Sequence, residues 1–312
     1  MRSETRLSGA TLPTWEGVLP PWPGELEDGV FVRRAPGTGT EPALFVHGLG
    51  GASTNWTDLM GLLAQTVQGE ALDLPGFGRS DPPRSGSYRL RTHVEAVVRR
   101  LEARSGPVHL FGNSLGGAVS TRVAALRPDL VRTLTLVSPA LPALRPKKGS
   151  DPRLPLLLLP GLSKLASRQL ARRSPEERAK AVLQLCYADY RSVPPERFQE
   201  AVDEVARRAA LPHAEDAFTA SLRGLVGSYL ERGSSSLWRQ AARVTAPTLL
   251  VWGSQDRLVD VAIAPRAAAT FRDSRLLVLP GVGHVAQLEQ PETVARVFLG
   301  MLEQLAAPAT SS

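Results

Sequence analysis

The stretch VHLFGNSLGG, residues 108–117, decides how this chain is expected to fold. It contains a short apolar strand, a sharp turn and the start of a helix, and Gly112, Ser114 and Gly116 fit the pattern G-x-S-x-G. At the tip of such a turn the serine backbone is strained, and the residues two before and two after it come so close that glycine is needed. The turn raises the serine hydroxyl above the sheet and leaves the N–H of Leu115 free to meet an oxyanion.

The turn has two possible interpretations, and the residues on either side of it favour one of them. A glycine-rich turn with a surface serine would fit the five-residue pattern equally well. The apolar strand before the turn and the apolar helix after it favour a nucleophile elbow, a strand–turn–helix unit that exposes a reactive serine. The apolar helix positions are Leu115, Ala118, Val119 and Val123.

Apolar strands alternate with helices on both sides of the elbow, which predicts a parallel sheet with helical crossovers. Apolar residues recur at helical spacing over 89–103 and again near the end of the chain, through Val294, Val297, Phe298 and Leu302. The predicted strands lie at 30–34, 43–46, 71–74, 108–111, 134–137, 248–252 and 276–279.

The alternation is interrupted in the middle of the chain, and this divides it into four predicted parts. Ser174, Pro175 and Glu177 form a helix-start signature with a capping box, and a second helix is expected over 196–210. The parts are an irregular arm (1–28), an α/β core (29–141 and 241–306), a helical cap (142–240) and a frayed tail (307–312).

Composition and charge narrow the possible functions. The chain has 312 residues, 43% of them hydrophobic, and a net charge of +7, most of which arises from 17 Lys and Arg against 11 Asp and Glu between Pro142 and Gln240. No aromatic-rich motif accompanies this charge, so a solvated surface is expected rather than a nucleic-acid site, while contact with an anionic membrane stays open. Cys186 is the single cysteine, which excludes an intrachain disulfide and is expected to pack in the core.

Targeting and membrane signals are not evident in the sequence. The first residues lack the apolar segment of a secretory signal, and no apolar run approaches the ~20 residues that span a bilayer. We therefore expect a cytoplasmic protein without an integral membrane segment. No group of His, Cys and carboxylates has metal-ligand spacing, so neither a metal nor another cofactor is expected. The oligomeric state is left open.

Three residues offer a catalytic triad. Ser114, Asp256 and His284 each follow an apolar strand, and the carboxyl ends of parallel strands meet at one edge of the sheet. A serine hydroxyl needs a base to remove its proton, and the base needs a carboxylate to hold its tautomer. Asp260 is a second candidate for that carboxylate.

Five motifs in this order make the chain resemble the α/β-hydrolase family over residues 30–141 and 241–305. They are HGLGG (47–51), DLPGFGRS (73–80), GNSLGG (112–117), GSQD (253–256) and GH (283–284). The resemblance implies a mostly parallel central sheet flanked by helices, with a helical cap inserted after the sixth strand. It implies Ser114 as nucleophile, His284 as general base and acid, and Asp256 as its orienting carboxylate. The backbone N–H groups of Leu49 and Leu115 would form the oxyanion hole.

Several other residues have expected roles around this site. Gly48, Asn113 and Trp56 are predicted to contact substrate. His47, Asp73 and Arg79 are expected to stabilise their loops, and His93 and His109 to be structural.

The serine at the elbow indicates the chemistry. Dehalogenases and epoxide hydrolases of the family use aspartate there, so Ser114 favours hydrolysis of a small to medium hydrophobic ester through an acyl-enzyme. GNSLGG and the sequence after His284 are also similar to the carbon–carbon hydrolases of meta-cleavage products, although the glycine–proline of their oxyanion loop is Gly48-Leu49 here. Haloperoxidase or perhydrolase side activity is known in relatives, and a non-catalytic receptor on the same scaffold is a third hypothesis. The cap is expected to cover Ser114 and supply an apolar acyl pocket.

Overall fold

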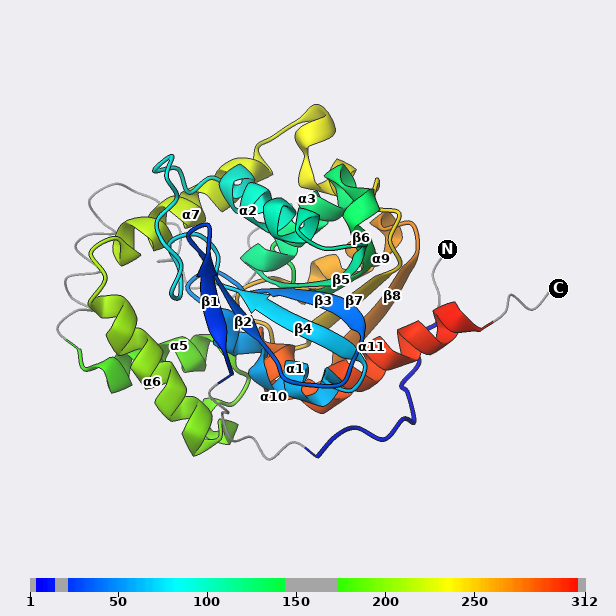
Figure 1. Ribbon diagram of the computed structural model, residues 1–312, viewed down its shortest axis with the longest axis horizontal. Coiled ribbons are helices and arrows are strands. Elements are labelled where there is room, and N and C mark those ends of the chain that lie inside the picture. Colours follow the sequence, from blue (N-terminus) through cyan, green and yellow to red (C-terminus); the bar gives the residue numbers. More distant parts are fainter. Residues whose placement is uncertain (1–3, 15–21, 144–172, 308–312) are drawn as a thin grey trace.

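A computed structural model describes residues 4–14, 22–143 and 173–307, and its centre is one eight-stranded sheet (Figure 1). The strand order is β1-β2-β4-β3-β5-β6-β7-β8. β1 and β2 pair antiparallel, as do β2 and β4, whereas all pairs from β4 to β8 are parallel. The strands are β1 (Gly24–Glu27), β2 (Val30–Arg34), β3 (Glu41–Val46), β4 (Val67–Leu72), β5 (Val108–Asn113), β6 (Val131–Val137), β7 (Thr248–Gly253) and β8 (Ser274–Leu279).

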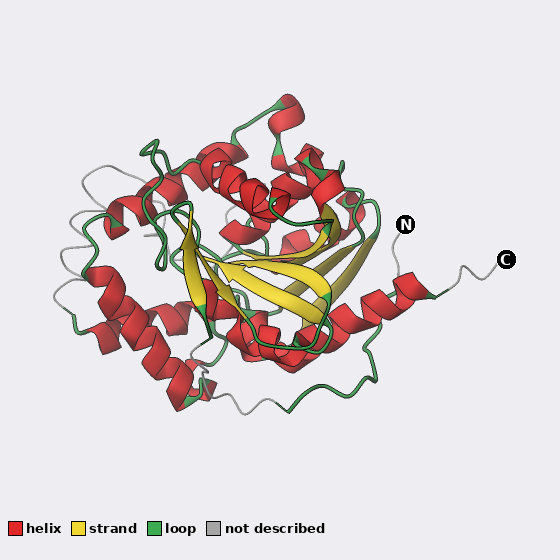
Figure 2. Ribbon diagram, viewed as in Figure 1, coloured by secondary structure: helices red, strands yellow, loops and turns green. Residues whose placement is uncertain are grey.

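Helices cover both faces of the sheet, so the molecule has three layers (Figure 2). The helices α2 (Leu90–Glu102), α3 (Leu115–Leu126), α8 (Leu237–Ala241) and α9 (Ala264–Thr270) pack on one face. The other face carries α1 (Thr57–Leu63), α10 (Ala286–Glu289) and α11 (Pro291–Ala306). The helices α5 (Pro175–Cys186), α6 (Pro195–Ala209) and α7 (Ala214–Tyr229) lie between β6 and β7 in the chain. Of the helices in the described ranges, none has the length and apolar character needed to cross a membrane.

The strand sequences explain this layering. Alternate side chains of a strand point to opposite faces, so a strand with apolar residues throughout serves two cores. In β3, Leu44 and Val46 join the cluster under α2 and α3, whereas Ala43 and Phe45 join the cluster under α1 and α11. The predicted mostly parallel sheet flanked by helices, with a helical segment after the sixth strand, is confirmed.

The sequence patterns predicted the bounds of α2 and α6 more closely than those of the strand β4. α2 and α6 begin and end within one residue of the predicted ranges, and Ser174 and Glu177 form the predicted capping box at the start of α5. The strand expected at 71–74 is β4, which ends at Leu72. The arm expected to be irregular contains β1, which pairs with β2 because Asp28 and a glycine form a tight turn between them.

Part of the predicted organisation lies outside the described residues. These are 1–3 and 15–21 of the arm, 144–172 of the cap and 308–312 of the tail. In the described part of the cap, α5 buries Ala179 and Leu183, whereas Val182 beside them is 46% exposed. Cys186 is half-buried at the end of this helix.

Candidate active site

The elbow has the geometry that its glycines predict. Ser114 joins β5 to α3 with φ 53° and ψ −116°, a left-handed conformation that non-glycine residues rarely adopt. A Cβ on Gly112 would lie 2.5 Å from the carbonyl oxygen of Gly116, and one on Gly116 would collide with that of Val46. As the first residue of α3, Leu115 has an N–H without an intrahelical acceptor. Ser114 is half-buried, while its neighbours in β5 and α3 are buried.

A buried carboxylate and imidazole pair lies after β7 and β8. Nδ1 of His284 is 2.9 Å from Oδ2 and 3.1 Å from Oδ1 of Asp256, and both residues are at most 4% exposed. The N–H groups of Leu258 and Val259 donate to Asp256 Oδ1 at 2.8 and 2.9 Å. Burial opposes ionisation of Asp256, but the nearby imidazole and these hydrogen bonds outweigh it and lower the pKa of the carboxyl. Asp256 is thus held ionised beside the histidine.

The loop that carries His284 is held by a carboxylate that the motif analysis did not select. Glu289 accepts hydrogen bonds from the N–H of Gly283 at 2.8 Å and of Ala188 at 2.9 Å, and burial raises the pKa of its carboxyl. The N–H of His284 donates to the carbonyl oxygen of Cys186 at 2.7 Å. The end of α5 therefore packs directly on the histidine loop. In the sequence, Glu289 could have been noticed as a carboxylate five residues after the GH motif.

The glycine-rich loop after β3 forms a tight turn against the elbow. The N–H of Gly51 donates to the carbonyl oxygen of Gly48 at 3.1 Å, and Gly50 has φ +73°. A Cβ on Gly48 would lie 3.1 Å from the Cβ of Ser114. The turn therefore packs against the serine with little room for a side chain at position 48. Leu49, the predicted oxyanion donor, is the second residue of the turn.

His47 stabilises this turn, as predicted. Its Nδ1 donates to the carbonyl oxygen of Gly48 at 2.7 Å, and its Nε2 accepts from the N–H of Leu74 at 2.9 Å, so the ring is the neutral Nδ1–H tautomer. Burial lowers the pKa of His47, which keeps it neutral. Both ring nitrogens are occupied, and the residue is no base for Ser114.

Asp73 and Arg79 also stabilise the loop in which they lie. The carboxylate of Asp73 accepts from the N–H groups of Ser53 at 2.5 Å and Arg79 at 2.7 Å, while the Arg79 guanidinium lies over the ring of Phe31. These contacts fasten the loop after β4 to the segment before α1 and confirm the structural role predicted for both residues.

His93 and His109 are structural as well. Each is buried and lies within 3.0 Å of one hydroxyl, that of Ser221 and Thr133 respectively. Burial lowers the pKa of His93 to about 3 and that of His109 to about 4, so both are neutral at pH 7. Asp260 caps the short helical turn after it and makes no contact with His284 of the kind that Asp256 makes.

The predicted substrate contacts fall in different places. Asn113 is buried at the elbow, and its Nδ2 donates to the carbonyl oxygens of Val137 at 3.0 Å and His284 at 3.3 Å. Gly48 adjoins Ser114 as described above. Trp56 is not brought to this site: its ring is fully buried in the core, 5.4 Å from that of Phe45, because it begins a helix that packs under the sheet.

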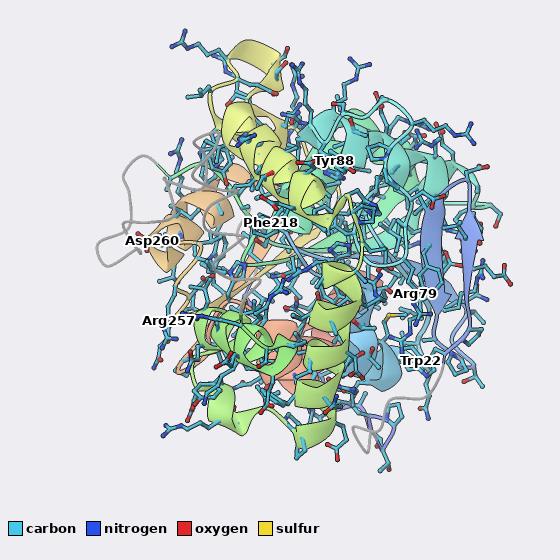
Figure 3. All side chains as sticks on the ribbon, turned by 90° about the vertical axis from the view of Figure 1, so that its left-hand side faces the viewer. Trp22, Arg79, Tyr88, Phe218, Arg257 and Asp260 are labelled. Atoms are coloured by element: carbon cyan, nitrogen blue, oxygen red, sulfur yellow. The ribbon has the colours of Figure 1, made fainter. Side chains whose placement is uncertain are left out.

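The helix α6 presents charged side chains to the core. Arg197 pairs with Asp58 of α1 through two hydrogen bonds of 2.9 and 2.6 Å, both side chains being buried. Three helical turns later, Nη1 of Arg208 donates to the carbonyl oxygen of Gly50 at 2.7 Å. Figure 3 views the molecule from the side that α5, α6 and α7 cover, with Phe218 of α7 labelled. The sequence signal was the i, i+3, i+7, i+11 spacing of Arg197, Glu200, Glu204 and Arg208, which places these charges along one face of the helix.

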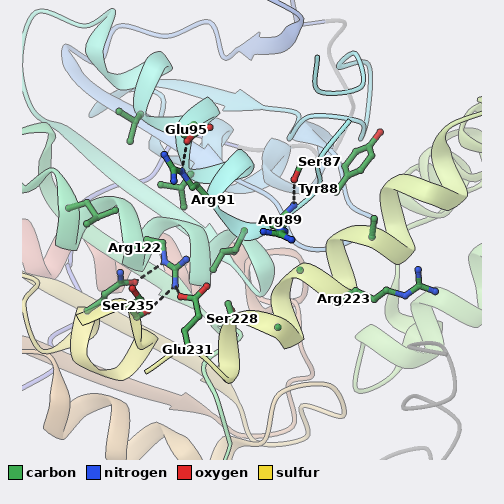
Figure 4. A pocket seen from close by; sticks show the side chains of 18 of the residues that line it. Ser87, Tyr88, Arg89, Arg91, Glu95, Arg122, Arg223, Ser228, Glu231 and Ser235 are labelled. Carbon is green, nitrogen blue, oxygen red and sulfur yellow. Dashed lines mark hydrogen bonds and ion pairs between the residues drawn. The ribbon is translucent and has the colours of Figure 1, made fainter. Parts of the chain in front are cut away.

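A groove of about 1340 Å³ lies elsewhere, between α2, α3 and α7 (Figure 4). Arg122 is hydrogen-bonded in its wall to Glu231, Gln240 and the carbonyl oxygen of Ser235. Neither the elbow serine nor the carboxylate–imidazole pair lines this groove. The groove is therefore separate from the predicted triad.

Comparison with known proteins identifies the family. A model of the alpha/beta hydrolase family matches residues 43–297, more than half of the chain, and the chain belongs to this family. A solved structure of a membrane phospholipase A superposes with a TM-score of 0.72 at 24% identity, covering 92% of this chain and 87% of that one. At that identity the likeness concerns the fold alone.

Three curated proteins that are similar to this chain are named for three different activities. A dihydrolipoyllysine-residue acetyltransferase component of an acetoin cleaving system (Cupriavidus necator) is 30% identical over 266 residues, and the chain spans only 64% of its length against 84% of its own. A monoacylglycerol lipase (Rattus norvegicus) is 28% identical, covering 85% of this chain and 76% of that protein. A 2-hydroxy-6-oxononadienedioate/2-hydroxy-6-oxononatrienedioate hydrolase (Cupriavidus pinatubonensis) is 27% identical, covering 85% and 88%. The relatives thus include a lipase and a hydrolase of another substrate class.

Proposed function

We propose that this chain is a serine hydrolase that cleaves a carboxylic ester of a small to medium hydrophobic substrate through an acyl-enzyme. The observation that carries the proposal is the buried Asp256–His284 pair at the same sheet edge as Ser114, the strained residue of the elbow. A carboxylate that fixes the tautomer of an imidazole is the arrangement that activates a serine hydroxyl. The similarity to a lipase supports an ester as substrate.

Acylation begins with His284. With Nδ1–H donated to Asp256, the free Nε2 accepts the Ser114 proton as Oγ bonds to the ester carbonyl carbon. The carbonyl oxygen becomes an oxyanion, which the N–H groups of Leu49 and Leu115 stabilise. The imidazolium then returns its proton to the alkoxide oxygen as the carbon–oxygen bond breaks, and the alcohol departs.

Deacylation repeats the same steps with water. His284 takes a proton from water, whose oxygen bonds to the acyl carbon, and a second oxyanion forms in the same hole. When the bond to Ser114 breaks, the imidazolium protonates the serine oxygen and the carboxylic acid leaves. Asp256 remains ionised throughout, since it stabilises the imidazolium without taking its proton.

Hydrolysis of a carbon–carbon bond in a vinylogous diketone is the second candidate. The similarity to a hydrolase of 2-hydroxy-6-oxononadienedioate favours it, as does the sequence GNSLGG at the elbow. The loop Gly48-Leu49, which replaces the glycine–proline of the carbon–carbon hydrolases, counts against it. The helices α5 to α7 would act as the cap over Ser114 in either case.

Two measurements test the proposal. A fluorophosphonate probe is expected to label the wild type and Ser120→Ala, a buried serine of α3, but not Ser114→Ala. Labelling of Ser114→Ala would assign the nucleophile to another residue. A panel of p-nitrophenyl esters of increasing acyl length, measured beside a meta-cleavage dienoate, is expected to give the higher kcat/KM on an ester. A higher value on the dienoate would establish the second candidate instead.

A further inference from the structure

The turn of residues 48–51, here called the oxyanion turn, is closed by a hydrogen bond between its first and last residues. The N–H of Gly51 donates to the carbonyl oxygen of Gly48 at 3.1 Å. Gly50, the third residue, has the positive φ that a type II turn requires at that place. Leu49 is the second residue, so the direction of its N–H depends on how firmly the whole turn is held.

Two side chains hold the oxyanion turn, one from the core and one from the inserted helices. From the core, His47 Nδ1 donates to the carbonyl oxygen of Gly48 at 2.7 Å. From the inserted helix α6, Arg208 Nη1 donates to the carbonyl oxygen of Gly50, also at 2.7 Å. The peptide between Gly50 and Gly51 is thus bound at both ends, its N–H within the turn and its carbonyl oxygen by the guanidinium.

The surroundings of Arg208 show that this contact is closely packed. A Cβ on Gly50 would lie 3.1 Å from Arg208 Nη1 and 3.1 Å from the ring of Phe218, so α6 and α7 both close on the turn. Burial lowers the pKa of Arg208, while the nearby Glu204 opposes the shift. A cation is costly to bury, and the hydrogen bond to the backbone offsets part of that cost.

The position of α6 is itself anchored to the core. Arg197 lies eleven residues before Arg208, three helical turns away on the same face, and pairs with Asp58 of α1. Because α6 is fixed at this point, the guanidinium of Arg208 reaches the turn from a defined direction. A movement of α6 away from the core would withdraw it.

We propose that Arg208 is a positioning residue for the oxyanion hole: through the carbonyl oxygen of Gly50 it holds the N–H of Leu49 in place to stabilise the oxyanion, so that activity depends on the position of α6. The proposal rests on the serine hydrolase function proposed above and extends it to the inserted helices. In this role Arg208 acts through Gly50 and is a positioning residue, not a catalytic one.

Kinetics on the 312-residue chain test this role. Arg208→Met removes the donor, and we expect kcat to fall by roughly 10- to 100-fold with KM changed less than about threefold, since loss of an oxyanion donor acts on the transition state. Arg208→Lys keeps a donor and is expected to recover most of the lost kcat. Arg207→Met is the matched control on the same helix, because Arg207 pairs with Glu204 and does not reach the turn.

Two further readouts separate positioning from a general structural role. A boronic acid, which forms a tetrahedral anionic adduct on a reactive serine, is expected to bind Arg208→Met more weakly by the same factor as the fall in kcat/KM. A neutral alcohol product is expected to bind equally well to both proteins. Hydrogen exchange at the Gly51 amide is expected to be faster in Arg208→Met and unchanged in Arg207→Met, a result that needs no catalytic activity.

Three outcomes would overturn the proposal. The first is a kcat of Arg208→Met no lower than that of Arg207→Met. The second is a loss confined to KM and to binding of the neutral alcohol, which would make Arg208 a substrate contact. The third is unchanged exchange at Gly51, which would show that the turn does not need Arg208. A wild type that fluorophosphonate fails to label would instead refute the serine hydrolase function, and with it this extension.

Discussion

The sheet core and the inserted helices meet the candidate site through different kinds of contact. On the core side, the serine and the carboxylate follow β5 and β7, whose residues are all buried, and the imidazole follows β8, a partly buried edge strand. On the inserted side, α6 approaches the same edge with Arg197 and Arg208, which bind Asp58 and the carbonyl oxygen of Gly50. Apolar packing is non-directional, whereas buried ion pairs and hydrogen bonds require one geometry. The core therefore sets where the candidate site is, and the inserted helices add directional contacts to loops that core residues such as His47 and Glu289 also hold.

The largest expected effect concerns the core residues. Asp256→Asn is expected to lower kcat by about 10⁴-fold, because the asparagine no longer stabilises the imidazolium or its tautomer. Steady-state hydrolysis of a p-nitrophenyl ester measures the change. Asp260→Asn is the control and is expected to stay within about twofold of the wild type. Near-normal kcat in Asp256→Asn, with a large loss in Asp260→Asn, would reassign the carboxylate.

The second effect concerns the ion pair between the two regions. Arg197→Met leaves a carboxylate buried beside an apolar side chain, and we expect a loss of about 3 kcal/mol in the free energy of unfolding, since breaking a buried pair costs about 3–5 kcal/mol. Urea unfolding measures it. The double variant Arg197→Met with Asp58→Asn is expected to recover part of the loss. Arg207→Met, whose pair with Glu204 is partly exposed, is expected to change the free energy by less than about 0.5 kcal/mol.

The third effect is a pH dependence of the free energy of unfolding, and it arises from Glu200 on the charged face of α6. Burial raises the pKa of Glu200 to about 7, against the nearby Arg197 and Arg33, with Asp58 and Glu204 adding to the rise. The folded state then retains a proton that the unfolded state releases near pH 4.5, so this group destabilises the fold increasingly as pH rises from 4.5 to 7.

Glu200→Gln isolates this contribution. The glutamine does not titrate, so its stability relative to the wild type is expected to rise across that window and to level off above pH 7, by on the order of 2 kcal/mol. Thermal unfolding at pH 5, 6, 7 and 8 measures the difference. The buried neutral histidines destabilise both proteins equally in acid and cancel in the comparison. A constant difference at all four pH values would contradict the raised pKa.

The smallest effect concerns the local signal that begins α5. Ser174 accepts from the N–H of Glu177 at 3.1 Å, and the Glu177 side chain accepts from the N–H of Ser174 at 2.9 Å. Ser174→Ala is expected to cost about 1 kcal/mol and to speed hydrogen exchange in the first turn of α5. The exposed Ser234→Ala is the control and should change neither quantity. Equal exchange in the two variants would show that packing alone holds the start of α5.

The sequence alone determined whatever depends on local geometry and strand order. The elbow follows from glycines that flank Ser114, the capping box of α5 from Ser174 and Glu177, and the meeting of Asp256 with His284 from two strands that end at one sheet edge. Each is decided by steric limits of the backbone or by the parallel pairing of neighbouring strands. These constraints act over a few residues or repeat regularly, so a pattern of letters contains them.

Only the tertiary structure decided which distant side chains meet across the two regions. Trp56 was expected at the substrate and lies in the core, because the helix it precedes turns that ring beneath the sheet. Glu289 supports the histidine loop, and Arg208 reaches Gly50 from 158 residues away. Such partners depend on the crossing of α5, α6 and α7 over the sheet edge, and no spacing along the chain encodes a crossing angle. In the sequence, a charged residue on an exposed helix face looks the same as one half-buried against a backbone carbonyl, until packing removes the water around one of them.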